Sequence, residues 1–124
     1  MPDLDGTWSW MPDAGDPRRY AEISHDASGI HLDDELARRE GLPGVILHGM
    51  HVFGQVVSIL DRESGGAPLS RVRVRFAGVA VPEATIDVTC ADGGAGVTFT
   101  AQQRERQVLR AGWATFDDGR PEDA

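Results

Sequence analysis

Apolar and polar residues alternate through the second half of the chain, which is the pattern of half-buried β-strands. The alternation predicts strands over Leu69–Ala80, Thr85–Cys90, Val97–Gln103 and Gln107–Phe116. A Gly-rich turn at residues 92–94 separates the second of these segments from the third. Another strand is predicted within residues 1–12, where Trp8 and Trp10 are separated by one polar residue. The pattern therefore predicts one strand near the start of the chain and a run of strands at its end.

The stretch between these strand regions has helical spacing instead. An Asp-Pro pair predicts a short helix over 17–23, with Asp16 as its N-cap and proline at the first helical position. Asp33 is predicted to cap a second short helix, Asp34–Glu40, which Gly41 ends.

A longer helix is predicted from about Gly49 to Arg62. Its apolar residues cover most of the circumference, so we expect it to be buried on nearly every side. They are Val52, Phe53, Val56, Val57, Ile59 and Leu60. A buried helix with one strand before it and antiparallel strands after it predicts an α+β fold. In that fold a curved sheet wraps around the central helix, which is the hot-dog arrangement.

Length and composition indicate a single globular domain. The 124 residues are 40% hydrophobic and 26% charged, which is typical of a folded chain with a real core. We expect the domain to span residues 1–116 and the polar tail 117–124 to be disordered.

Charge and residue usage exclude several functions. A net charge of −8 argues against nucleic acid as a partner, because phosphate binding needs a basic face. The chain contains no lysine, which excludes Schiff-base chemistry. No apolar run approaches the roughly 20 residues of a membrane span, and the first residues do not resemble a signal peptide. The single cysteine, Cys90, excludes an internal disulfide and predicts a cytoplasmic protein.

Candidate chemistry is concentrated between Ser24 and Met50. Asp26 and His31 lie five residues apart in a turn of small residues. His48 and Gly49 follow at the start of the long helix, where a backbone N–H has no intrahelical acceptor and can bind an oxyanion. This combination of a carboxylate, an imidazole and a glycine amide predicts an active-site segment.

Each of these residues is also suited to a purely structural role. Asp26 is also suited to capping a turn, and His31 to a hydrogen-bonded place in the core. His48 is suited to shaping the turn into the helix. His51, three residues on, is suited to packing. The four histidines together with Asp26 also suggest a metal site, with His48 and His51 three residues apart, although the spacing matches no standard signature. The arginines at 71, 73 and 75 are suited either to binding phosphate or to a solvated sheet face.

Residues 20–50 resemble the MaoC-like hydratase/dehydratase family, which includes R-specific enoyl-CoA hydratases. The resemblance lies in YAEISHDASGIHLDD and, after a short helix, LPGVILHGM. It implies that Asp26 and His31 are catalytic and that Gly49 binds the oxyanion, with Ser28 and His48 in supporting contacts to the substrate. His25, Ser28 and Gly29 stand where the family pattern has Gly, Asn and Pro. Likewise, residues 82–84 read Pro-Glu-Ala in place of Pro-Gly-Asp.

The resemblance implies a lyase that adds or removes water across a 2-enoyl thioester of CoA or a carrier protein, through the R-3-hydroxyacyl form. It implies no cofactor and no metal. It also implies a dimer, formed either with a second copy or with another hot-dog subunit. Three alternatives stay open at this stage: a non-catalytic partner subunit, a thioesterase and a metal enzyme. The second is disfavoured because residues 49–60 contain no acid.

Overall fold

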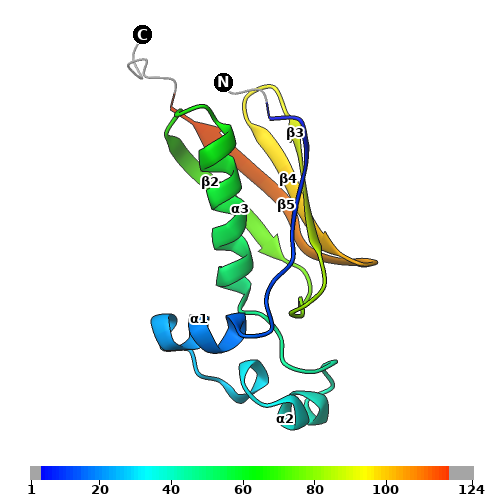
Figure 1. Ribbon diagram of the computed structural model, residues 1–124. Coiled ribbons are helices and arrows are strands. Elements are labelled where there is room, and N and C mark those ends of the chain that lie inside the picture. Colours follow the sequence, from blue (N-terminus) through cyan, green and yellow to red (C-terminus); the bar gives the residue numbers. More distant parts are fainter. Residues whose placement is uncertain (1–3, 118–124) are drawn as a thin grey trace.

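The computed structural model describes residues 4–117 and has the predicted α+β architecture (Figure 1). A five-stranded antiparallel sheet has the strand order β1-β3-β4-β5-β2. The strands are β1 (Gly6–Trp10), β2 (Leu69–Phe76), β3 (Ile86–Asp92), β4 (Val97–Gln103) and β5 (Arg106–Phe116). The α-helices are α1 (Asp16–Ser24), α2 (Asp34–Arg39) and α3 (Gly49–Glu63), with a 3-10 turn, η1, at Gly29–His31. The predicted tail, 117–124, lies outside the described residues except for Asp117.

The hydrophobic core lies between α3 and the sheet. Val52, Val56, Ile59 and Leu60 are the buried residues of the helix. They pack with sheet residues that alternate with more exposed ones, including Ile86, Val88, Cys90, Val97, Phe99 and Ala101. Cys90 is therefore a core residue, and its burial raises the pKa of the thiol to about 11. The hot-dog arrangement predicted from the sequence is confirmed.

The prediction that α3 is buried on nearly every side is wrong for the single chain. Met50 is 57% exposed, Gly54 and Ser58 are exposed, and Phe53 is only half buried. The sheet covers one side of the helix, and α1 and α2 lie beyond its N-terminal end (Figure 1). An apolar face of α3 is consequently open to solvent.

Two predicted boundaries also differ. The strand predicted over Leu69–Ala80 ends at Phe76, because the chain then leaves the sheet and the Ala80 carbonyl accepts a hydrogen bond from the Leu47 amide at 2.8 Å. Asp16 is not the N-cap of α1. Gly15 occupies that position, and the Asp16 carboxylate instead binds the Asp13 amide and Arg19. Asp33 does cap α2, accepting from the amides of two residues in its first turn.

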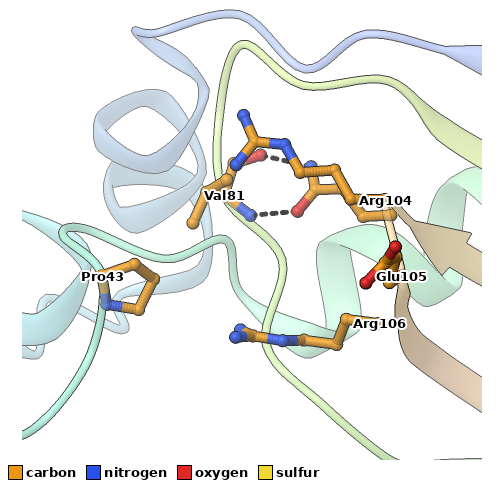
Figure 2. Close-up of a pocket in the computed structure, with 6 residues that line it drawn as sticks. Pro43, Val81, Arg104, Glu105 and Arg106 are labelled. Atoms are coloured by element: carbon orange, nitrogen blue, oxygen red, sulfur yellow. Dashed lines mark hydrogen bonds between the residues drawn. The ribbon is translucent and has the colours of Figure 1, made fainter.

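A cavity of about 330 Å³ lies where the β4–β5 turn meets the loop before β3 (Figure 2). Arg104, Glu105 and Arg106 approach it from the turn, opposite Pro43 and Val81. The buried Gln103 side chain ties this region together: it accepts from the Val81 amide at 2.8 Å and donates to the Val81 carbonyl at 2.7 Å. This amide bridge anchors the loop that packs beside the start of α3, and it involves none of the predicted site residues.

Candidate active site

A cavity of about 350 Å³ collects the predicted residues at the N-terminal end of α3. It is lined by Tyr20, Ser24, Asp26, His31, His48, Gly49, Met50 and Phe76. The chain reaches it from the end of α1, from η1, from the first turn of α3 and from the last residue of β2. Four of the five predicted site residues therefore line one cavity, and the fifth, Ser28, contacts it through Asp26.

The two Asp26 carboxylate oxygens have different surroundings. Oδ1 accepts a hydrogen bond from the Ser28 hydroxyl at 2.9 Å and from the Ser28 amide at 3.4 Å. Oδ2 faces His31 Nε2 at 3.8 Å. The Ser28 hydroxyl and amide hold the pKa of Asp26 below its ordinary value, and His31 and His48 lower it further when their rings are protonated. The carboxylate is therefore ionised at neutral pH.

His31 is held in one orientation. Its side chain is only 8% exposed, and Nδ1 lies 2.8 Å from the Ile46 carbonyl oxygen. Because a carbonyl can only accept, Nδ1 carries the hydrogen and Nε2 of the neutral ring presents its lone pair toward Asp26. A separation of 3.8 Å is too long for a direct hydrogen bond between the two side chains.

His48 holds the turn to the helix, as one of its predicted roles required. Its Nε2–H donates to the Asp26 backbone carbonyl at 2.9 Å. Its ring stacks on that of His31 with centroids 3.7 Å apart and planes inclined by 13°. The buried imidazole thus fixes both the main chain of Asp26 and the ring of His31. His51, on the next turn, stacks on Tyr20 and so packs beside the site.

Gly49 is the first residue of α3, and His48 is its N-cap. The first four N–H groups of a helix have no intrahelical acceptor. In α3 the His51 and Val52 amides donate to the His48 carbonyl. The Gly49 and Met50 amides come earlier in the helix, so they have no acceptor within it. A Cβ at position 49 would lie 3.1 Å from Phe76 Cδ1, so only glycine fits this wall of the cavity without displacing the ring.

Asp26, His31 and His48 also form a group whose potential ligand atoms lie within 4.8 Å of one another. The group contains three of the five residues that the sequence suggested for a metal site and leaves out His25 and His51. In both imidazoles one ring nitrogen already donates a hydrogen bond to a backbone carbonyl. Their lone pairs lie in nearly parallel planes, whereas metal ligands must point at one centre. The donor set is poorly arranged for a metal ion and better arranged for a small hydrogen-bonding molecule.

Two departures from the family pattern occur where the backbone is left-handed. His25, at the C-cap of α1, has φ 62°, and Glu83 has φ 64°. Glycine adopts this conformation without the steric cost that a Cβ brings. Both positions therefore have a conformation that favours glycine, and this chain adopts it with larger side chains. Gly29, in place of proline, packs against Leu36, where a Cβ would lie 2.9 Å from Cδ1.

The sequence pattern missed part of the cavity wall. Met50 and Phe76 line it but carried no local signal, since apolar residues at these positions look like core. Tyr20 could have been found, because it is the first residue of the stretch that carries the family resemblance. Its ring lies 4.7 Å from that of His48 and 5.0 Å from that of His51, centroid to centroid.

The fold and the site define a hot-dog domain with an acid–imidazole pair at the start of its central helix. The family model described as "MaoC like domain" matches residues 12–113, and the chain belongs to this family.

Proteins similar to this chain in sequence and in structure include dehydratases. A 3-hydroxyacyl-thioester dehydratase X from Mycobacterium tuberculosis is 34% identical over 83 residues, covering 67% of this chain and 29% of the relative. A MaoC-like dehydratase from Phytophthora capsici superposes with a TM-score of 0.83 at 25% identity, covering 94% of this chain and 41% of that one.

The ChsH1–ChsH2 complex from M. tuberculosis also has this fold, with a TM-score of 0.74 at 12% identity over 94% of this chain and 100% of that one. The chain spans a third or less of each curated relative it matches. None of the helices within residues 4–117 combines the length and apolar character that crossing a membrane requires.

Proposed function

We propose that the chain is a hydratase/dehydratase that adds water to a 2-enoyl thioester or removes it from the R-3-hydroxyacyl form. The observation that carries this proposal is the shared cavity of Asp26, His31 and Gly49. An ionised carboxylate and an imidazole lone pair face each other at 3.8 Å beside a helix N-terminus. Relatives whose names state a dehydratase of 3-hydroxyacyl thioesters support the substrate class.

The distance between the two side chains fits a bridging water. Two acceptors, Asp26 Oδ2 and His31 Nε2, are both satisfied when one water donates a hydrogen to each. The lone pairs of that water then point away from the pair and toward the β-carbon of a bound enoyl thioester. In hydration, the water oxygen bonds to the β-carbon, one of its protons passes to the pair, and a proton from the pair reaches the α-carbon. The charge on the pair is the same before and after the cycle.

Negative charge develops on the thioester oxygen while the α-carbon awaits its proton. A backbone N–H at a helix N-terminus stabilises this charge, because the donor and the helix dipole are fixed before the reaction begins. We assign this role to the Gly49 amide. Ser28 lowers the pKa of Asp26, and His48 holds the pair in position, so neither needs to touch the reacting atoms.

A second candidate is a non-catalytic subunit that pairs with an active hot-dog chain. The open apolar face at Met50 and Phe53 favours a partner of some kind. The heteromeric ChsH1–ChsH2 neighbour shows that the fold supports complexes of two different chains.

The low cysteine content remains the ground for proposing a cytoplasmic location.

Hydration of crotonyl-CoA, followed by the loss of enoyl absorbance, tests the catalytic proposal. We expect Asp26→Asn and His31→Ala each to lower kcat at least about 100-fold, the usual contribution of a positioned acid or base. Asp61→Asn and His25→Ala, which change exposed residues of the same types, serve as matched controls and should stay within about threefold of the wild type. Circular dichroism checks that each variant is folded. A wild-type chain that hydrates no thioester, or a dyad variant with nearly normal turnover, contradicts the proposal.

A further inference from the structure

A polar residue occupies a core position at the end of β4. The inward positions of this strand alternate with outward ones and begin with Val97, Phe99 and Ala101. The next inward position is Gln103, which is 5% exposed. A buried amide group loses its hydrogen bonds to water, and this costs free energy unless the protein supplies other partners. Gln103 is therefore expected to bind another part of the chain, and the reaction proposed above makes no use of it.

The partners of Gln103 are backbone groups of the segment 77–85, which connects β2 to β3. Its side-chain oxygen accepts from the Val81 amide at 2.8 Å, and its nitrogen donates to the Val81 carbonyl at 2.7 Å and to the Ala84 carbonyl at 2.9 Å. The bonds to Val81 are drawn in Figure 2. Exchange of one N–H and one C=O is how opposite residues pair in an antiparallel sheet. The side chain thus replaces a neighbouring strand for a segment that has left the sheet.

The segment held by this amide is bonded in turn to the chain just before α3. The Ala80 carbonyl accepts from the Leu47 amide at 2.8 Å. The preceding residue, Ile46, is bonded to η1 through both of its backbone groups. Its amide donates to the Ile30 carbonyl at 3.0 Å, and its carbonyl oxygen lies 2.8 Å from His31 Nδ1. Residues 46 and 47 therefore connect the loop after β2 with the turn that carries the imidazole.

The last bond of this series decides how the imidazole is oriented. The Ile46 carbonyl keeps the hydrogen of the neutral His31 ring on Nδ1, which leaves the Nε2 lone pair facing Asp26 at 3.8 Å. A shift of the segment 77–85 would move the acceptor of the Leu47 amide and, with it, the adjoining Ile46 carbonyl. Misplacement of a reacting group by about 1 Å can lower a rate about 100-fold. The position of this carbonyl therefore matters for catalysis.

We propose that Gln103 is a positioning residue for His31. Its amide holds the segment 77–85, and the backbone bonds of that segment hold the Ile46 carbonyl where it accepts from Nδ1. Gln103 does not line the active-site cavity, so its effect passes through the main chain. This inference rests on the proposed function for the part that His31 plays in turnover. The orientation of the ring, in contrast, is measured without any substrate.

The test removes the amide and keeps the shape of the side chain. Gln103→Met loses all three hydrogen bonds and retains an unbranched side chain of similar length. Proton–nitrogen correlation NMR follows the imidazoles of histidine-labelled protein at about pH 8, where histidine is neutral, and His31→Ala assigns the His31 signals. We expect one tautomer in the wild type, with its hydrogen on Nδ1. In Gln103→Met the two tautomers should mix, so that the Nδ1 and Nε2 resonances shift toward each other.

Turnover should change together with the ring. In the crotonyl-CoA assay we expect kcat of Gln103→Met to fall at least about tenfold while KM changes by less than about threefold, because a misplaced ring affects the reaction more than binding.

Ser64→Ala is the matched control. Ser64 is also a buried polar residue, and its hydroxyl donates to two backbone carbonyls, those of Asp61 at 2.8 Å and Ala67 at 3.1 Å. It is the C-cap of α3 and so lies at the opposite end of the helix from the site. Its replacement should lower the melting temperature, as that of Gln103 should, and leave the His31 signals and kcat at their wild-type values.

Circular dichroism shows whether each variant folds. If Gln103→Met does not, Gln103→Glu takes its place, because a carboxyl group keeps the bond from the Val81 amide but cannot donate to both carbonyls. A folded variant in which the His31 signals or kcat stay at wild-type values overturns the inference, and so do equal changes in Ser64→Ala. A wild type without turnover would contradict the proposed function alone, since the NMR signals would still decide the role of Gln103.

Discussion

Replacing Gly49 by proline tests the oxyanion role of its amide with little effect on the fold. Proline removes the backbone N–H, but at the first position of a helix that N–H has no intrahelical acceptor to lose. The residue before a proline must be extended, and His48 already has φ −68° and ψ 133°. We therefore expect Gly49→Pro to change the free energy of unfolding by less than about 1 kcal/mol.

The catalytic cost should be much larger. Removing one fixed oxyanion donor lowers kcat by about 10²–10³, or about 2.7–4 kcal/mol of transition-state stabilisation. The added Cβ would lie 3.1 Å from Phe76 Cδ1, and this ring is 55% exposed and free to move aside. Gly49→Ala introduces the same Cβ and keeps the N–H, so it measures the steric effect alone. We expect the alanine variant to stay within about tenfold of the wild type.

Steady-state hydration of crotonyl-CoA gives kcat and KM for both variants, and thermal melts report their stability. The prediction concerns the ratio between them: kcat of Gly49→Pro should fall at least about tenfold below that of Gly49→Ala. Equal kcat values in two folded variants would show that the amide stabilises no charge in the transition state.

Two smaller predictions follow from the turn after α1. Ser28→Ala removes the hydroxyl that lowers the pKa of Asp26. The pKa of this carboxyl, followed by NMR titration of its carbon resonance, should therefore rise in the alanine variant. Ser24→Ala, which loses a contact to the Asp26 amide only, should leave that pKa unchanged. His25 has a left-handed backbone conformation that glycine adopts more easily, so His25→Gly should raise the free energy of unfolding in urea by about 1 kcal/mol. His25→Ala keeps a Cβ and should give no such gain. An unchanged free energy of unfolding in the glycine variant would mean that φ 62° carries no strain.

The local parts of the site could be predicted from the sequence. Asp26 and His31 lie five residues apart in one turn, so their closeness could be predicted. Asp33 was also predictable as a cap, because its bonds reach only two and three residues ahead. These two features depend on contacts between residues that are close in the chain. The expectation that Gly49 joins the turn came from the family resemblance instead, because the hydrogen bonds that bring the two together span 15 and 22 residues.

The parts that sequence reasoning missed depend on distant contacts. Phe76 reaches the cavity only because β2 pairs at the edge of the sheet and α3 lies beside it. The apolar circumference of α3 indicated burial without showing whether the same chain or another one provides the cover. At the start of α1, Asp16 is paired with Arg19 at 2.7 Å, and this competing contact moves the cap to Gly15.

Two parts of the chain line the cavity with different kinds of side chain. Its polar groups come from one stretch that ends in the first turn of α3, whereas Phe76 comes from the rim of the sheet. Substitutions along that rim can therefore reshape the cavity while its polar groups stay fixed. Over evolutionary time, such a division allows a lineage to change which molecule the cavity accommodates without rebuilding the polar groups around it.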